Sequence, residues 1–410
     1  MKGYAEALEW LYSTQLFGIK PGLEPVFRMT EVLGVPLEPK ADAGRPVFRI
    51  HVAGTNGKGS TCALLASVCR RAGLRTGLYT SPHLVSFRER IQVNGECIPE
   101  DAVLRGVEML RRLVERWEPH PTFFELVTVL GLWWFHQNAV EALILETGMG
   151  GRLDATNVVT PAVSVLTPVG MDHQKYLGET LELIAGEKAG IIKPGVPVCS
   201  APQSPEVRRV FSEAAYRAGS RLQWIVEPWT QGDLALRGEV QRWNAALAEA
   251  SLLALPFSFS REVVRQGLSS AQWPGRFERV RRDLVLDGAH NPHAAAQLVS
   301  TWRSEYGCER AHVVFGAAED KDVAMMLRIL GPVVETLTLV SIRGKRAMPL
   351  EELRELAVRT LPGVPVRTGH PLEEILAERA EGVRLVTGSL FLVGEALAVV
   401  GGLPREHSLQ

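Results

Sequence analysis

A glycine-rich segment, HVAGTNGKGSTCALL at residues 51–65, combines residue types that bind phosphate. Its glycines allow backbone N–H groups to converge on phosphate oxygens, and Lys58 places a positive charge beside Ser60. The spacing is unusual, because the common nucleotide-binding loop has four free positions between its first glycine and its Gly-Lys-Ser/Thr, and this segment has fewer. An ordinary glycine-rich turn is the alternative, but a lysine and a serine at a helix start favour a nucleoside triphosphate.

Two further side chains could bind a metal ion beside that phosphate. Glu146 lies in LETGMGGRLDATN and His173 in TPVGMDHQKYLG, and each follows an apolar, strand-like run. A carboxylate and a neutral imidazole suit a divalent ion that keeps several waters and a phosphate oxygen. A hydrogen-bonded structural histidine is the alternative for His173 alone, but a glutamate and a triphosphate loop on the same predicted edge favour the metal.

Two more segments carry charged residues next to predicted element ends. Lys188 lies in GEKAGIIKPG, after a helix expected to begin near Thr180, and by itself it is a helix-surface lysine. In LDGAHNPHAAA a buried strand ends at Asp287, His290 follows, and Pro292 opens a helix. A strand-end Asp-Gly-Ala-His favours a site, with a plain turn as the alternative.

These residues need a scaffold that brings strand ends together. Apolar runs alternate with helix-length amphipathic segments, which is typical of a mainly parallel sheet covered on both faces. Ligands bind such sheets at the carboxyl ends of the strands, where the phosphate loop, Glu146 and His173 fall. The predicted strands are 47–54, 75–80, 141–148 and 161–169, and the predicted helices are 60–72, 99–117 and 122–136.

A second alternating series follows a change in character near residues 269–280. Its predicted strands lie near 284–287, 311–316, 335–340 and 383–387, and its predicted helices near 292–306, 322–330, 349–359 and 389–400. The fold class is therefore α/β, with an N-terminal P-loop-type, mainly parallel sheet domain and a second, smaller Rossmann-like α/β domain. We place the first domain at 1–270, a linker at 271–276 and the second domain at 277–410.

The composition favours a globular cytoplasmic protein. A length of 410 residues fits two domains, and a net charge of −1 gives no reason to expect nucleic acid or an anionic membrane as partner. The five cysteines are odd in number and lack a C-x-x-C pair, so they read as reduced thiols. The N-terminus has no signal-peptide pattern, and the apolar run at 126–135 is too short to span a bilayer.

Segments spread over nearly the whole chain resemble the folylpolyglutamate synthase/dihydrofolate synthase family of the Mur ligase superfamily, whose members are ATP-dependent amide-forming ligases. They are YAEALEWLYS (4–13), GLEPVFRMTEVLG (22–34), HVAGTNGKGS, YTSPHLVSFRERIQVNG (79–95), TFFELVT (122–128), LETGMGGRLDATN (145–157), MDHQKYLG (171–178), GEKAGIIKPG, PGRFE (274–278), DGAHNPH (287–293), DKD (320–322) and TGSLFLVGEA (387–396).

The resemblance implies roles for individual residues. Those implied to bind ATP are Gly54, Thr55, Asn56, Gly57, Lys58, Gly59, Ser60, Asn244, Arg276, Asp287 and His290. Those implied to bind two Mg²⁺ ions are Ser81, Glu146, His173 and Lys188, the last as a carbamate. Those implied at the pterin site are Thr122, Phe123, Phe124, Glu125, Arg152, Leu153 and Asp154, and the implied catalytic residues are Lys58, His173 and Lys188.

One segment departs from the family pattern. GEVQRWNAA (238–246) resembles G-x-H-Q-x-x-N-A, but Val240 replaces the histidine, which leaves the adenine contact open although Gln241 and Asn244 are in place.

The reaction that the resemblance implies gives the loop a purpose. The γ-phosphoryl group of ATP passes to a substrate carboxylate, and the amine of L-glutamate then displaces phosphate to form an amide. The implied partners are small molecules, namely a folate or dihydropteroate, L-glutamate and ATP, and the implied state is a monomer in the cytoplasm. Whether dihydropteroate, reduced folates or both are used stays open, as does the length of the glutamate chain.

Three other classes of protein are less consistent with the sequence. A muramyl-peptide ligase carries a whole UDP-sugar domain ahead of the loop, and the residues before position 51 are too few for one. A motor or regulatory P-loop NTPase needs a conventional loop and an aspartate-bearing magnesium strand, and neither is apparent. A nucleotide-binding module without catalysis is the third alternative, and substrate-dependent phosphate release would exclude it.

Overall fold

The computed structural model describes residues 1, 3–17, 22–38, 47–344, 346–378, 382–404 and 406. The chain divides into two compact units. Unit 1 comprises Met1–Pro82, Arg88–Ala235 and Arg242–Gln272, and unit 2 comprises His83–Phe87, Leu236–Gln241 and Trp273–Gln410. Two short segments, 83–87 and 236–241, therefore group with unit 2 although they lie within the range that we assigned to the first domain.

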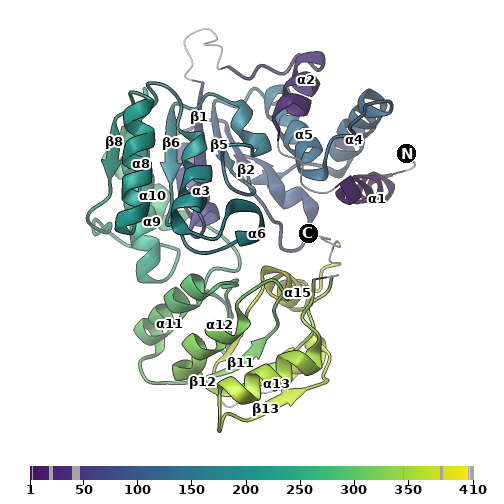
Figure 1. Cartoon of the computed structure of the whole chain (residues 1–410), viewed down its shortest axis with the longest axis vertical. Coiled ribbons are helices and arrows are strands. Elements are labelled where there is room, and N and C mark those ends of the chain that lie inside the picture. The colour runs from purple at the N-terminus through teal and green to yellow at the C-terminus, as the bar shows by residue number, and fades with distance from the viewer. Residues whose placement is uncertain are drawn as a thin grey trace. The chain divides into compact units, whose positions relative to one another are not determined.

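Unit 1 is built on an eight-stranded sheet of order β4-β3-β2-β5-β1-β6-β7-β8 (Figure 1). Its strands are β1 Phe48–Ala53, β2 Thr76–Tyr79, β3 Ile91–Val93, β4 Glu96–Cys97, β5 Ala142–Glu146, β6 Val163–Leu166, β7 Val198–Ser200 and β8 Leu222–Trp224. In the order β2-β5-β1-β6-β7-β8, each strand pairs with its neighbour in parallel. At the β2 edge, β3 and β4 add an antiparallel hairpin. The predicted mainly parallel sheet is confirmed.

The helices of unit 1 cover both faces of this sheet. They are α1 Tyr4–Ser13, α2 Glu24–Val32, α3 Lys58–Arg71, α4 Glu100–Val114, α5 Phe123–Gln137, α6 Gln174–Leu177, α7 Leu181–Lys188, α8 Pro205–Arg217, α9 Glu239–Leu253, which also enters unit 2, and α10 Arg261–Ser270. Every residue of β1 is buried, as expected for a central parallel strand with helices on both sides. α7 and α8 pack their apolar side chains on β6 and β7.

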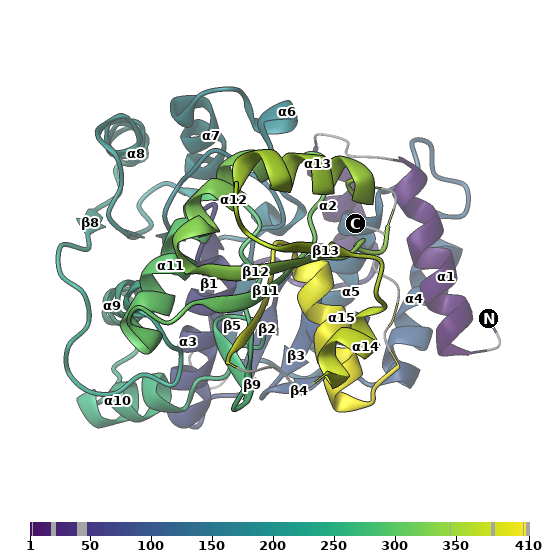
Figure 2. The ribbon, with the colours of Figure 1, turned by 90° about the horizontal axis from the view of Figure 1, so that it is seen from below.

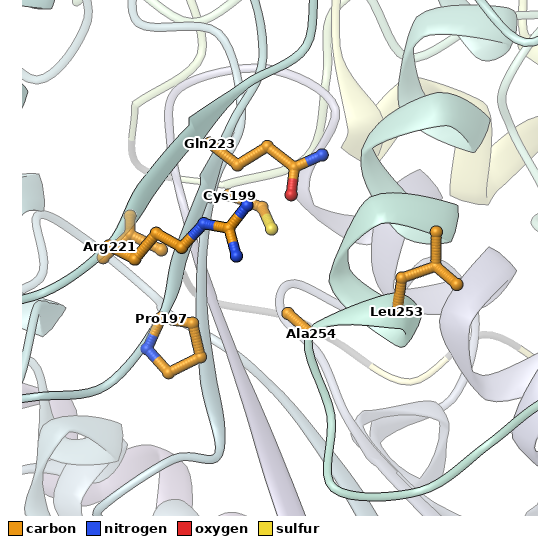
Figure 3. Close-up of a pocket in the computed structure, with 7 residues that line it drawn as sticks. Pro197, Cys199, Arg221, Gln223, Leu253 and Ala254 are labelled. Atoms are coloured by element: carbon orange, nitrogen blue, oxygen red, sulfur yellow. The ribbon is translucent and has the colours of Figure 1, made fainter.

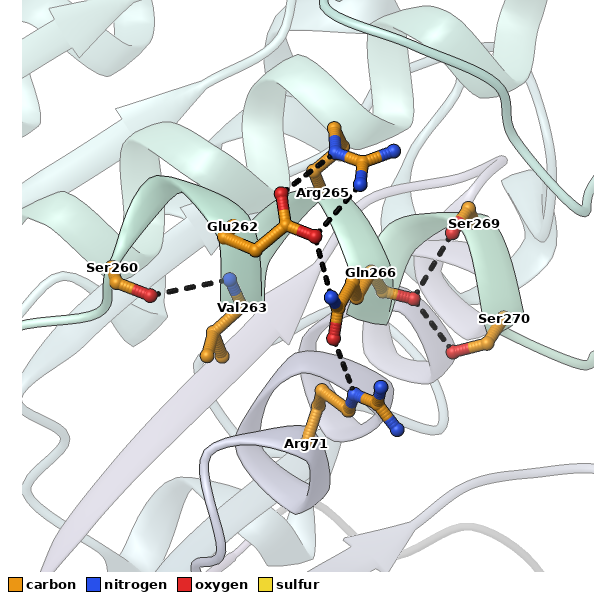
Figure 4. A network of polar contacts seen from close by, with 8 residues as sticks. All are labelled: Arg71, Ser260, Glu262, Val263, Arg265, Gln266, Ser269 and Ser270. Carbon is orange, nitrogen blue, oxygen red and sulfur yellow. Dashed lines mark hydrogen bonds and ion pairs between the residues drawn. The ribbon is translucent and has the colours of Figure 1, made fainter.

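Helix α3, which starts at the phosphate loop, is fixed in place by α10 (Figure 4). A Cβ on Gly267 would lie 2.6 Å from the Val68 Cα, so only glycine permits this close approach. The Ser67 hydroxyl donates to the Gly267 carbonyl at 2.7 Å, and the Arg71 Nε donates to Gln266 at 2.8 Å. These contacts with α10 therefore fix the position of α3, the helix that begins at Lys58.

Unit 2 contains a six-stranded sheet of order β13-β12-β11-β14-β10-β9, parallel except for β9. Its strands are β9 Glu278–Arg281, β10 Leu284–Leu286, β11 Ala311–Phe315, β12 Val334–Leu339, β13 Val366–Thr368 and β14 Arg384–Thr387, and its helices are α11 Pro292–Tyr306, α12 Val323–Leu330, α13 Leu350–Thr360, α14 Leu372–Ala377 and α15 Leu390–Gly401. Figure 2 shows α11, α12 and α13 on one face and α14 and α15 on the other, each layer with its own apolar core. The predicted second α/β series is confirmed.

Within the described part of the chain, no helix is both long and apolar enough to cross a membrane.

Candidate active site

The phosphate loop owes its shape to two glycines. A Cβ on Gly54 would lie 1.8 Å from the Thr167 Oγ1, so no other residue fits there. Gly57 adopts a left-handed conformation with φ of 86° as the N-cap of α3, and a Cβ on it would lie 2.7 Å from the Asn244 Oδ1. The backbone therefore enters the helix in a turn that L side chains resist, and Asn244 of α9 lies against it.

Further hydrogen bonds fix the position of the loop at the carboxyl end of β1. The Thr55 N–H donates to the Pro168 carbonyl at 2.9 Å, and the Thr55 hydroxyl lies 3.1 Å from both the carbonyl oxygen and the N–H nitrogen of Gly170. The half-buried Lys58 donates from Nζ to the Thr55 carbonyl at 3.3 Å. The lysine head thus lies over the loop, close to the start of α3, where the first N–H groups of a helix point toward a bound anion.

Lys188 is brought to the same loop from the end of α7. It is 4% exposed, and its Nζ donates to the Gly54 carbonyl at 2.9 Å. Burial, aided by the positive charge of Lys58, lowers the pKa of Lys188 to about 7, and Asp172 and Asp154 oppose the shift. The amine is therefore uncharged in a large fraction of molecules near neutral pH. The sequence analysis did not identify Asp172 as part of this site, although its position next to His173 could have indicated it.

The structure brings Ser81 and Glu146 together. Glu146 is the last residue of β5, and the neighbouring strand β1 pairs with it at Val52, just before the phosphate loop. Its buried carboxylate accepts the Ser81 N–H at 3.3 Å. Burial raises the pKa of the Cys62 thiol in α3; Glu146 raises it further and Lys58 opposes this, so both charges act on the first turns of α3.

His173 lies on the next connection, after β6. It is exposed and has a left-handed backbone, φ 52°, as the N-cap of α6, and its N–H donates to the Asp172 carboxylate at 2.9 Å. A left-handed conformation is uncommon for a residue with a side chain and occurs often at functional sites. Among the described residues, no three His, Cys, Asp or Glu side chains gather into a metal-binding group. A divalent ion here would therefore need water or phosphate oxygens as well, as Mg²⁺ commonly does.

The predicted pterin segment at 122–125 begins α5. Thr122 and Glu125 form a capping box, in which the Glu125 carboxylate accepts from the Thr122 N–H at 2.6 Å and from its hydroxyl at 2.8 Å. Phe123 is buried, whereas Phe124 is half-buried and lies over Gly148, where a Cβ would come within 2.4 Å of the ring. Of these four side chains, Phe124 is the most accessible to a substrate.

The second predicted pterin segment follows β5. Arg152 is exposed and forms an ion pair with Glu187 at 3.2 Å, and Leu153 is 45% exposed. Asp154 is buried as the N-cap of a short 3₁₀ helix, Ala155–Val158, and burial raises the pKa of its carboxyl group. Arg152 and Leu153 can therefore reach a ligand, whereas Asp154 faces the protein.

In unit 2, the carboxyl end of β10 carries the predicted Asp287 and His290. Asp287 accepts two backbone N–H groups, from Phe277 and Ala289, both at 2.9 Å. Burial raises the pKa of Asp287 and the Arg276 guanidinium opposes the rise, so these two predicted residues interact electrostatically. His290 lies 2.8 Å, through Nδ1, from a backbone carbonyl oxygen two residues earlier, ahead of α11.

Val240 lies in the first turn of α9 and is half-buried. Gln241 and Asn244, the two members of the pattern that are present, are 5% and 2% exposed. Because Asn244 packs on Gly57, the departure at Val240 does not alter the side chain that shapes the loop.

A separate pocket of about 390 Å³ lies beside β7 and β8, at one edge of the sheet (Figure 3). Its lining includes Pro197 and Arg221, which precede β7 and β8, and Leu253 at the end of α9. The strand order places it at the amino ends of parallel strands, away from the phosphate loop at the carboxyl ends. It is therefore not part of the candidate active site.

Comparisons with known proteins agree with this arrangement. The Mur ligase middle domain family matches residues 52–197, and the Mur ligase glutamate ligase domain family matches residues 275–390. The dihydrofolate synthase/folylpolyglutamate synthase of Bacillus subtilis (strain 168) is 34% identical over 430 residues, covering 96% of this chain and 98% of that protein.

Two solved structures extend the similarity to three dimensions. Mycobacterium tuberculosis folylpolyglutamate synthase complexed with ADP matches with a TM-score of 0.87 and 30% identity, covering 98% of this chain and 99% of that one. Escherichia coli FolC in complex with DHPP and ADP matches with a TM-score of 0.84 and 31% identity over 97% and 98% of the two chains. The resemblance seen in the sequence is confirmed: the chain belongs to the dihydrofolate synthase/folylpolyglutamate synthase family of Mur ligases.

Proposed function

We propose that this protein is an ATP-dependent ligase that joins L-glutamate to a folate, to dihydropteroate, or to both. The observation that carries the proposal is the glycine loop at the end of β1, with Lys58 and the buried Lys188 bonded to it and Glu146 one strand away. A phosphate loop next to a carboxylate and a lysine of low pKa suits phosphoryl transfer. The names and bound ADP of the related proteins support the same chemistry.

Chemically, the loop serves to activate a carboxylate. A carboxylate oxygen of the folate attacks the γ-phosphorus of ATP, the bond to the bridging oxygen breaks, and ADP leaves. The amine of L-glutamate then attacks the acyl carbon, the C–O bond breaks, inorganic phosphate leaves with the electron pair, and the amine loses a proton. Lys58 and the N–H groups that begin α3 stabilise negative charge on the transferred group.

The donor set at the sheet edge fits magnesium ions. Ser81, Glu146, His173 and a carbamate on Lys188 would hold two Mg²⁺, which would neutralise phosphate charge when bound. A carbamate forms when an uncharged amine attacks carbon dioxide and releases a proton. The lowered pKa of Lys188, about 7, supports this step, because the amine is then uncharged in a large fraction of molecules near neutral pH. The hydrogen bond from its Nζ to the Gly54 carbonyl lies at the phosphate loop, so the carbamate oxygens would be available to ions bound there.

We assign the remaining roles by position. Phe124, Arg152 and Leu153 are the accessible side chains of the two pterin segments and would contact the folate. The other members of those segments, Thr122, Phe123, Glu125 and Asp154, are buried and would shape the site. For Arg276, Asp287 and His290 we retain the ATP-binding role that the family resemblance implies, and for residues 277–410 the binding of glutamate.

Release of phosphate tests the function. We expect ADP and phosphate to appear only when ATP, magnesium, L-glutamate and a folate or dihydropteroate are all present. Phosphate release that is independent of the folate and of glutamate would identify a simple ATPase and contradict the proposal. No phosphate release under any combination, with ATP still bound, would favour a nucleotide-binding module.

A magnesium titration tests the metal ligands. We expect Glu146→Gln and His173→Asn each to raise the magnesium concentration for half-maximal activity about tenfold, because each replaces one proposed ligand by a neutral amide of different charge or reach and leaves the others. Asparagine at position 173 tolerates the left-handed backbone found there, so the fold is preserved. Lys175→Ala, an exposed change in the same helix, is the control. Unchanged titrations in both variants would contradict the metal role.

The proposed ATP-binding role of Arg276 is tested by Arg276→Ala. We expect the KM for ATP to rise about tenfold, because the lost guanidinium would contact phosphate or ribose and its charge also balances Asp287. Arg282→Ala is the matched control, since Arg282 is exposed. A KM for ATP within twofold of the wild type in Arg276→Ala would remove this residue from the site.

A further inference from the structure

The carboxylate of Asp154 is fully occupied by the protein. Its Oδ2 accepts the N–H groups of Gly148 and Met149, both at 2.9 Å. Its Oδ1 accepts the Thr156 N–H at 3.0 Å and the Thr156 hydroxyl at 2.5 Å. A carboxylate has about four acceptor sites, so none remains for a substrate.

The hydroxyl of Thr156 links this carboxylate to a second buried residue. The Thr156 Oγ1 lies 2.8 Å from the His51 Nε2, and both side chains are completely buried. The hydroxyl has one proton and gives it to Asp154, so it must accept from His51, which therefore carries its proton on Nε2. Burial lowers the pKa of His51 to about 3, with Lys193 adding to the effect, so the ring is neutral at working pH.

What Asp154 holds is the glycine turn, residues 148–151, that follows Glu146 and Thr147. A Cβ on Gly148 would lie 2.4 Å from the Phe124 ring, and a Cβ on Gly151 would lie 2.8 and 2.9 Å from the carbonyl oxygens of Glu187 and Lys188. The glycine turn therefore lies between Phe124 on one side and the end of α7, with Lys188, on the other. A shift of the turn would move the surface under Phe124.

We propose that Thr156 and His51 are positioning residues for folate binding: they hold the Asp154 carboxylate, which in turn holds the glycine turn beneath Phe124. The inference rests on the proposed function in one respect, because it takes Phe124 as a folate contact. Asp154 then affects folate affinity through the turn and makes no hydrogen bond to the substrate.

Removal of the Thr156 hydroxyl tests the proposal. Thr156→Val has nearly the same shape but takes one donor from Asp154 and leaves the His51 Nε2–H without its acceptor, whereas Thr156→Ser keeps both bonds. We expect hydrogen–deuterium exchange of the peptide containing Gly148 and Met149 to quicken about tenfold in Thr156→Val and to stay within twofold of the wild type in Thr156→Ser.

Kinetics give the second readout. We expect the KM for the folate to rise about tenfold in Thr156→Val, with the KM for ATP within twofold of the wild type, and Thr156→Ser to match the wild type. Thr301→Val is the matched control, because Thr301 is buried and donates within its own helix to the Gln297 carbonyl at 2.9 Å. General damage to the fold would not spare the KM for ATP.

Two results would overturn the inference. Faster exchange with an unchanged KM for the folate would show that the turn is not used for folate binding. A raised KM with unchanged exchange would show that Thr156 acts on the substrate by another route. If the wild type proves not to use folates, the proposed function fails, and exchange alone still decides whether Thr156 holds the turn.

If Thr156→Val does not fold, Thr156→Cys takes its place, since a thiol fills the space but is a weak donor. His51 gives an independent arm: His51→Gln retains an amide N–H donor, whereas His51→Leu has none. We expect the leucine variant to show the faster exchange, and equal exchange in the two folded variants would remove His51 from the chain of hydrogen bonds.

Discussion

Replacement of Lys58 by alanine is expected to lower kcat/KM for ligation by a factor of about 100 or more, with little change in thermal unfolding. Among the described residues, the half-buried Lys58 ammonium donates to the Thr55 carbonyl of its own loop, so its removal leaves no unpaired donor in the core. Its positive charge, in contrast, would be needed when negative charge moves between the γ-phosphate and the substrate carboxylate. Steady-state kinetics with ATP, folate and glutamate measure the loss.

Two controls make this prediction specific. Lys58→Arg keeps the charge but changes its shape and reach, so we expect partial activity between that of alanine and that of the wild type. Arg282→Ala removes an exposed positive charge elsewhere and should match the wild type. Activity of Lys58→Ala within a factor of two of the wild type would contradict the assignment of the loop.

Lys188→Ala is expected to be nearly inactive, with kcat reduced about 100-fold or more. The Lys188 Nζ donates to the Gly54 carbonyl, so the mutation removes a bond to the loop as well as the proposed carbamate. If the carbamate oxygens are what matters, small carboxylates added in solution should restore part of the activity. Lys188→Arg should not be restored, because its fixed positive charge occupies the place of the anion.

The pH dependence of carbamate formation gives a further test of the same residue. The pKa of Lys188 is about 7, so the uncharged amine becomes the larger fraction as pH rises through that value. After removal of carbon dioxide at low pH, activity should therefore return faster at pH about 8 than at pH about 6 when both samples receive the same concentration of dissolved carbon dioxide. Full activity of Lys188→Ala, or an unmodified amine in a crystal structure with ATP and magnesium, would contradict the carbamate.

The sequence predicted the elements that position the site well, for physical reasons. β1, β5 and β6 are rich in apolar residues and every residue in them is buried, and α3 starts at a glycine with a positive φ that the loop pattern anticipates. Pro292 opens α11, and Thr180 caps α7, as the residue types at those positions indicate. Parallel pairing then placed the ends of β1 and β5 side by side.

What the sequence did not predict depends on tertiary contacts. Lys188 looked like a surface lysine, and only the fold shows that it is buried against Gly54. The resemblance places Asp154 at the pterin site, which stays a prediction. The hydrogen bonds that its carboxylate accepts from Gly148 and Thr156, and the pairing of Thr156 with His51, have no periodic signal in the sequence. The β3–β4 hairpin was also missed, although Asn94-Gly95 between two short strands is a typical two-residue turn.

Mass spectrometry of the reaction products tests the central claim most directly. The protein is incubated with ATP, magnesium and ¹⁵N-labelled L-glutamate, together with dihydropteroate in one sample and tetrahydrofolate in another, with Lys58→Ala as the control. We predict a product heavier than at least one of these acceptors by one labelled glutamyl residue, with one ADP and one phosphate formed per product, and no such product in the control. Hydrolysis of ATP without any glutamylated product from either acceptor would contradict the account.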